Sequence, residues 1–93
     1  MRISIREEAA SDLADIFSWV AKENSDAAHD LVRRIRDRID RLATPGLSHI
    51  GRLGIVNGTR ELVETPYVIV YEVYEPISEI EVLAVFHTKQ ERE

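Results

Sequence analysis

The sequence contains no cysteine, only three prolines and four glycines, and few aromatic residues (6%). Without cysteine the chain can form neither disulfide bonds nor thiolate metal sites. No window approaches the roughly 20 apolar residues that a membrane-spanning helix needs. The segment Met1 to Glu8 lacks the apolar centre of a secretory signal. We therefore expect a cytoplasmic protein that makes no membrane contact.

Hydrophobic residues make up 44% of the 93 residues and charged residues 31%, a balance typical of a folded globular domain. A chain of this length is expected to form a single domain, residues 1–93. The formal net charge of −5 argues against charge-driven nucleic-acid binding over the whole surface. It also leaves room for a partner that carries positive charge.

The first half of the chain predicts one strand followed by two helices. Residues 2–6 alternate polar and apolar side chains, which is typical of a half-buried strand. Apolar residues recur at helical spacing over residues 7–23 and again over residues 26–43, and Asn24 between them can cap the second helix. Trp19 lies off the main apolar stripe of the first helix, and we expect it to pack within the domain. Two helices joined by so short a link form an antiparallel hairpin.

The second half of the chain predicts three strands. Residues 59–64 and 67–73 are rich in β-branched or aromatic side chains, and the break at Thr65-Pro66 between them indicates a hairpin. A last strand is expected over residues 79–86, whereas residues 46–57 are expected to be irregular. One face of the last strand is expected to carry Ile80, Val82, Ala84 and Phe86.

The order strand, helix, helix, strand, strand, strand indicates an α+β fold of two layers. The economical arrangement packs the helical hairpin on one face of a mostly antiparallel sheet, whose last three strands form an antiparallel meander. The opposite face of the sheet is then the natural functional surface, and we expect the guanidinium of Arg60 to lie on it.

Arg60 is the first candidate for a functional residue, because a charged side chain in the middle of a hairpin needs a partner or a ligand. A salt bridge to a nearby carboxylate is one interpretation. The other is a fork that binds a phosphate or a partner's carboxylate, for which the guanidinium is suited. Arg52, on a loop between glycines, and Tyr71, on the central strand, are further candidate binding residues.

His87 stands where the last strand ends, and a histidine near solvent can serve as a general acid or base. A structural role is the alternative for such a lone histidine. His29 and His49 show no ligand spacing to each other or to His87. We therefore expect no metal site and no cofactor.

A series of short motifs covers nearly the whole chain. They are Asp12-Leu13-x-x-Ile16, Ala27-Ala28, Ile39-x-x-Leu42-x-x-Pro45, Gly51-Arg52-x-Gly54, Gly58-Thr59-Arg60-Glu61-Leu62-Val63, Tyr67-Val68-Ile69-Val70-Tyr71 and Val85-Phe86-His87. In this order the motifs resemble the RelE/ParE superfamily of toxins from type II toxin–antitoxin systems. The fold of that superfamily agrees with the one predicted above.

The resemblance implies a small toxin that arrests growth and is neutralised by a cognate antitoxin, with which it forms a hetero-oligomer. RelE-like members cleave mRNA in the ribosome, whereas ParE-like members inhibit DNA gyrase. In the nuclease branch the central strand usually carries an arginine directly after the residue that matches Tyr67. This chain has Val68 there. We therefore favour ParE-like inhibition of gyrase, without enzymatic activity.

Two alternatives stay open. A metal-independent endoribonuclease would need a base, an acid and a cation that stabilises the phosphate, and Arg60, His87 and Lys89 are the residues that could supply them. The other alternative is a degenerate family member that is no longer toxic and only binds its antitoxin.

Overall fold

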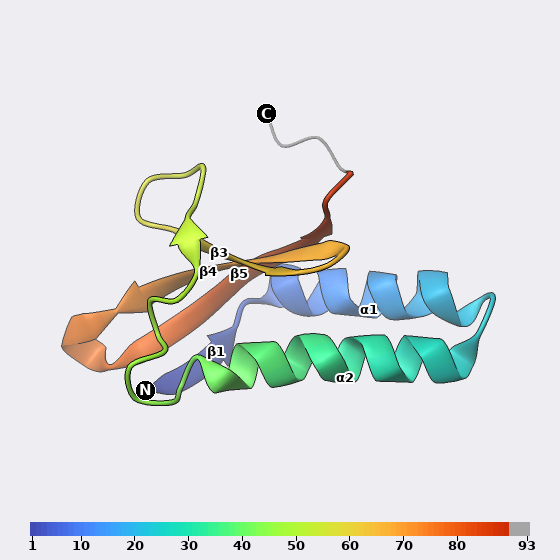
Figure 1. Ribbon diagram of the computed structural model, residues 1–93, viewed down its shortest axis with the longest axis horizontal. Helices are drawn as coiled ribbons and strands as arrows, with labels where there is room; N and C mark the ends of the chain where they lie inside the picture. The colour runs from blue at the N-terminus through green and yellow to red at the C-terminus, as the bar shows by residue number, and fades with distance from the viewer. Residues whose placement is uncertain (90–93) are drawn as a thin grey trace.

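A computed structural model of the chain describes residues 1–89, and Figure 1 shows its helices lying beneath the sheet. The helices are α1 (Glu7–Ala21) and α2 (Ser25–Arg41). The strands are β1 (Arg2–Ile5), β2 (Arg52–Leu53), β3 (Arg60–Glu64), β4 (Tyr67–Tyr74) and β5 (Glu79–His87), with a 3-10 turn η1 (Glu75–Ile77) before β5. The predicted α+β fold is confirmed, and β2 is an additional strand in a segment that was expected to be irregular.

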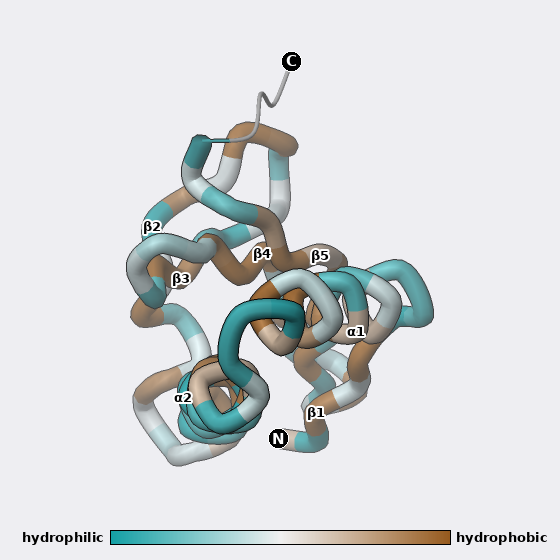
Figure 2. The backbone as a smooth tube through the Cα atoms, turned by 90° about the vertical axis from the view of Figure 1, so that its right-hand side faces the viewer, coloured by the Kyte–Doolittle hydropathy of each residue, from teal (hydrophilic) through white to brown (hydrophobic). Residues whose placement is uncertain are grey.

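Within residues 1–89 the strands form one five-stranded sheet in the order β1-β5-β4-β3-β2. The β1 strand pairs with β5 in parallel, and the other neighbours are antiparallel. Figure 2 shows both helices nearly end-on, on the same side of β3, β4 and β5. Because β1 pairs only with Glu79 to Val82, the second half of β5 forms an edge of the sheet next to α1.

The hydrophobic core lies between the helices and the sheet. Its largest side chains without exposed surface include Ile35 and Ile39 from α2 and Ile69 and Tyr71 from β4. Burying one such aliphatic side chain contributes roughly 1.5–3 kcal/mol relative to leaving it exposed. The odd-numbered residues of β4 share this face because side chains alternate along a strand.

The helices end within two residues of the predicted positions. The side chain of Asn24 accepts a hydrogen bond from the backbone N–H of Ala27 at 3.0 Å, so the predicted cap of α2 is confirmed. Glu7 and Glu8 occupy the first turn of α1, where the helix dipole favours negative charge. No helix within residues 1–89 is long and apolar enough to cross a membrane.

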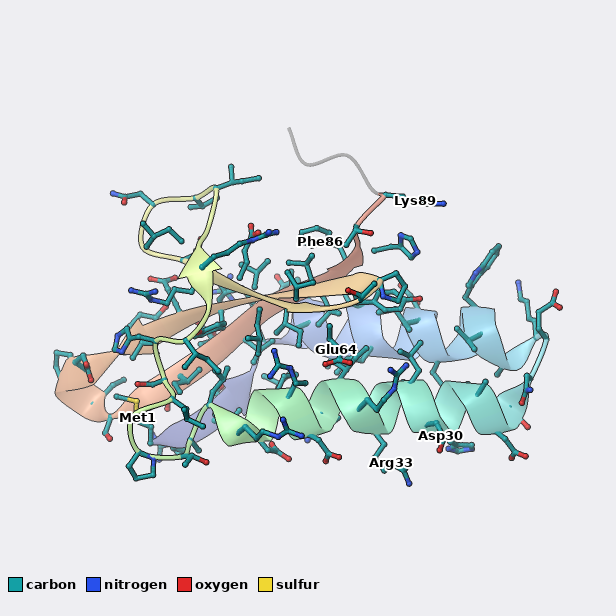
Figure 3. The ribbon with its side chains drawn as sticks, viewed as in Figure 1. Met1, Asp30, Arg33, Glu64, Phe86 and Lys89 are labelled. Atoms are coloured by element: carbon teal, nitrogen blue, oxygen red, sulfur yellow. The ribbon has the colours of Figure 1, made fainter. Side chains whose placement is uncertain are left out.

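The last strand departs from the predicted alternation. Val70 lies opposite Ala84, but Tyr71 lies opposite Val82, so β5 contains one extra residue, a β-bulge. After the bulge Val85, rather than Ala84, faces the core. The prediction that Ile80, Val82, Ala84 and Phe86 share one face is therefore wrong, because strict alternation assumes an uninterrupted ladder. Figure 3 shows Phe86 on the side of the sheet away from the helices.

Candidate functional site

Arg60 begins β3 and lies on the side of the sheet that faces the helices. It stands opposite Tyr71 and two residues before Leu62, both of which belong to the core. Its Nη1 donates hydrogen bonds to the backbone carbonyl oxygens of His49 at 3.1 Å and Gly51 at 2.9 Å. The prediction that Arg60 lies on the opposite, free face is wrong. Its hydrogen-bond partners are also carbonyl groups, not the carboxylate expected for a salt bridge.

Tyr71 holds the same loop from β4. Its side chain is fully buried, and its hydroxyl oxygen accepts a hydrogen bond from the backbone N–H of Gly51 at 2.9 Å. Burial raises the pKa of Tyr71 above its ordinary value, although the bond to Gly51 and the charge of Arg60 oppose the rise. A Cβ atom at position 51 would lie 2.8 Å from both the Tyr71 hydroxyl and the Glu61 carbonyl oxygen, so this approach requires glycine.

Arg52 lies opposite Glu61, and its Nη2 is 3.0 Å from a carboxylate oxygen of Glu61. The Glu61 side chain is only 5% exposed, and a buried carboxylate requires such a partner. The structure thus brings together all three predicted binding residues, Arg52, Arg60 and Tyr71. Their polar groups hold the chain's own residues 49–52, which we call the anchored loop, against the sheet.

His87 lies at the other end of the sheet, opposite Tyr67. The two rings pack edge to face with their centroids 5.3 Å apart. The Nδ1 atom of His87 accepts a hydrogen bond from the backbone N–H of Lys89 at 3.0 Å. His87 and Lys89 therefore lie together at this end of the sheet.

Arg60 and His87 are far apart. They pair with Tyr71 and Tyr67, which are four residues apart on β4, and they belong to the strands on either side of it. Strand geometry then separates their Cα atoms by about 16 Å. The structure does not bring Arg60 together with His87 and Lys89, the other residues of the predicted nuclease set.

A hollow of about 320 Å³ lies next to His87, between α1 and the end of β5. We call it the α1–β5 hollow, and its lining residues are Asp12, Asp15, Ile16, Trp19, Tyr67, Val85, Phe86 and His87. A carboxylate oxygen of Asp12 accepts a hydrogen bond from the backbone N–H of Val85 at 2.9 Å, at the open edge of β5. Trp19 is 71% exposed, so the prediction that it packs within the domain is wrong.

The sequence interpretation missed this hollow, although the helix carried a signal for it. Asp12, Asp15 and Trp19 occupy positions i, i+3 and i+7 and therefore share one face of α1. Nothing in the sequence showed that β5 would end against this face. His87, which also lines the hollow, was identified in the sequence, but as a candidate general acid or base.

The charged side chains of α2 form ion pairs both within the helix and with the sheet. Among the described residues, the ion pair inside this helix joins Asp30 and Arg33 at 3.0 Å (Figure 3). Arg34 and Arg38 instead reach Glu64 at the end of β3, at 3.6 Å and 3.1 Å. The Arg38 contact is ionic, because its buried Nε forms no hydrogen bond with any described residue. These two arginines therefore join α2 to the sheet.

The face of the sheet away from the helices carries charges that are paired near β1. Arg2 lies 2.8 Å from Glu79, and Arg6 lies 3.1 Å from Glu81. The hydroxyl of Tyr74 donates to Glu81 at 3.2 Å. Desolvation and the neighbouring glutamates raise the pKa of Tyr74. In the part of the chain that the structure describes, no group of three or more His, Asp or Glu residues is arranged to hold a metal ion.

Comparison with known proteins agrees with the motifs. Residues 3–92 match the family described as "ParE toxin of type II toxin-antitoxin system, parDE". The chain is also 36% identical over 92 residues to "Putative toxin Y4kP" of Sinorhizobium fredii (strain NBRC 101917 / NGR234). That match covers 97% of this chain and 91% of the relative.

Solved structures share the fold. A chain from the chromosomal ParDE TA system of P. aeruginosa superposes with a TM-score of 0.80 at 26% identity, covering 94% of this chain and 95% of that one. A chain from the toxin–antitoxin complex RelBE2 of Mycobacterium tuberculosis gives 0.55 at 20% identity, covering 92% and 88%, which shows the fold alone. The chain thus belongs to the ParE toxin family of type II toxin–antitoxin systems, within the RelE/ParE superfamily.

Proposed function

We propose that this toxin arrests growth by binding and inhibiting DNA gyrase, without catalysing a reaction of its own. The observation that carries the proposal is the position of Arg60. Its guanidinium donates to carbonyl groups of the anchored loop, and its Cα lies about 16 Å from that of His87. The remaining candidates for catalysis, His87 and Lys89, have no arginine from β3 beside them.

Metal-free RNA cleavage would need a base, an acid and a phosphate-stabilising cation within hydrogen-bond reach of one ribose and its phosphate. The ParE-like interpretation also rests on Val68, which stands where nuclease relatives carry an arginine. Val68 is 2% exposed, so this position offers RNA neither charge nor surface. The net charge of −5 likewise opposes tight binding to ribosomal RNA.

The described part of the chain has the exposed apolar surface that a binding protein needs. Between α2 and β3 several aliphatic side chains are about half exposed or more, namely Ile50, Leu53, Ile55 and Val56. Apolar side chains gathered on one short segment commonly mark a surface that contacts another macromolecule. The cognate antitoxin, which we expect to form a hetero-oligomer with this toxin, also requires such surface.

A supercoiling assay tests the proposal. Purified toxin is added to DNA gyrase, ATP and relaxed plasmid, and in parallel to ribosomes translating a defined mRNA. We expect loss of supercoiling at toxin concentrations near that of gyrase, with the mRNA intact. Cleavage of the mRNA together with normal supercoiling would overturn the proposal in favour of the endoribonuclease.

The alternative of a degenerate, non-toxic antitoxin-binding module predicts a different result in the same assays. A chain of that kind would leave both supercoiling and mRNA unchanged, and its induction in cells would not slow growth. Filamentation and a DNA-damage response after induction are expected instead if gyrase is the target.

A further inference from the structure

We propose that the α1–β5 hollow binds an arginine side chain presented by a partner polypeptide. The hollow joins carboxylates to aromatic rings, and its lining residues include neither lysine nor arginine. The imidazole of His87 accepts a hydrogen bond from the Lys89 N–H at its Nδ1. The lining is therefore acidic and aromatic, the combination that favours a cation.

The carboxylates have acceptor capacity left for a ligand. Asp12 uses one oxygen for the Val85 N–H, and an ionised carboxylate offers about four acceptor sites. Among the described residues, neither Asp12 nor Asp15 forms an ion pair. They lie three apart on α1, so they are neighbours on the helix surface and their like charges repel. A bound cation would relieve that repulsion.

The aromatic wall supplies the second part of the site. Trp19 is 71% exposed, and its ring already has a cation nearby, since the Nζ of Lys22 lies 5.4 Å from the ring centroid. Trp19 lines both this hollow and a neighbouring one, whereas Lys22 lines only the neighbouring one. Tryptophan is the best aromatic partner for a cation, and guanidinium groups also stack on aromatic faces.

Arginine fits this arrangement better than a metal ion or a lysine. No group of three metal-ligating side chains occurs within residues 1–89, which excludes a protein-built metal cage in this part of the chain. A planar guanidinium can bind carboxylates in pairs while it stacks on a ring, whereas an ammonium is a compact, strongly hydrated charge. The volume of about 320 Å³ is at the lower end for small-molecule sites, which suits one long side chain.

The cognate antitoxin is the partner that family membership supplies, and we assign the arginine to it. The net charge of −5 would favour the approach of a basic segment. This inference depends on the existence of an antitoxin and not on gyrase as the target, so each proposal can fail alone.

The single tryptophan of the chain makes the test direct, because Trp19 lines the hollow. Purified toxin is titrated with N-acetyl-arginine amide while Trp19 fluorescence is recorded, and N-acetyl-citrulline amide serves as an uncharged probe of the same shape. We expect a saturable change with the arginine probe and about tenfold weaker binding of the citrulline probe. Equal binding of both probes, or no saturation, would overturn the proposal.

Matched variants separate this site from general charge attraction. Asp15→Asn should weaken binding of the arginine probe several-fold, whereas Asp37→Asn, an equal charge change on the exposed side of α2, should leave it unchanged. Both positions are exposed, so neither variant threatens the fold. An equal loss in both variants would show attraction to the acidic surface as a whole and would contradict a built site.

Discussion

The anchored loop and the α1–β5 hollow lie at opposite ends of the sheet. They differ in whether their polar side chains are satisfied by hydrogen bonds within the chain. At the loop the guanidinium of Arg60 and the hydroxyl of Tyr71 form hydrogen bonds with backbone groups of the same chain. At the hollow Asp12 accepts one backbone hydrogen bond, neither Asp12 nor Asp15 forms an ion pair with a described residue, and Trp19 is 71% exposed. A charged residue within a strand can thus be a requirement of the fold, whereas carboxylates without an ion pair beside an exposed ring leave acceptor capacity for a partner.

Arg60→Ala should produce the largest loss of stability at the anchored loop. Removing the guanidinium leaves the carbonyl groups of His49 and Gly51 without their donor, and hydrogen bonds to charged groups contribute about 1.5–3 kcal/mol. Urea unfolding followed by circular dichroism measures the change. Arg36→Ala is the control, because Arg36 is exposed, and it should change stability by less than about 0.5 kcal/mol. Equal stability of the two variants would contradict a structural role for Arg60.

Tyr71→Phe should have the next largest effect. The change keeps the ring but leaves the buried N–H of Gly51 without its acceptor, which destabilises a protein by about 1–3 kcal/mol. Unfolding in urea again measures it. Tyr74→Phe is the matched control, since its hydroxyl bonds to Glu81 in a half-buried position, and a smaller loss is expected there. A larger loss for Tyr74→Phe would argue against the anchored loop.

Tyr71 should also make the free energy of unfolding decrease as the pH rises into the alkaline range. Because burial raises its pKa, the folded state keeps the phenolic proton to higher pH than the unfolded state. Its contribution is complete below the unfolded pKa of about 10 and is lost as the pH rises from there through the folded pKa. Urea midpoints measured on both sides of pH 10 should therefore fall less steeply in Tyr71→Phe than in the wild type. An unchanged slope would show that Tyr71 titrates alike in both states.

His87→Ala should have the smallest effect of the set. His87 is half-buried at a strand end, and its edge-to-face contact with Tyr67 contributes about 0.5–1.5 kcal/mol. We expect a loss of stability in that range and growth arrest equal to that of the wild type. Loss of growth arrest at unchanged stability would give His87 a catalytic role and weaken the distinction between the two ends.

The elements were predictable because their signals are local. The helical stripes, the cap at Asn24 and the break at Thr65-Pro66 act over a few residues, and the structure has α2 and β3 close to the expected bounds. The bulge in β5, because of which Val85 and not Ala84 faces the core, has no such local signal. It arises from the pairing of β4 with β5, which sequence alternation does not encode.

The functional surfaces were harder to predict because they depend on which elements meet. Arg60 shares a strand face with Leu62, and that spacing already implied the side facing the helices once Leu62 is placed in the core. The hydrogen bonds to the anchored loop required the path of residues 44–51, which has no periodic signal. Trp19 was expected to pack within the domain although it lies off the apolar stripe of α1, but its side chain is 71% exposed.

The double variant His87→Ala/Lys89→Ala tests most directly the claim that the toxin arrests growth without catalysing a reaction. Wild type and variant are assayed side by side for inhibition of gyrase supercoiling and for cleavage of ribosome-bound mRNA. The account predicts that both proteins inhibit supercoiling to the same extent and leave the mRNA whole. An mRNA that the wild type cuts and the variant spares would contradict it.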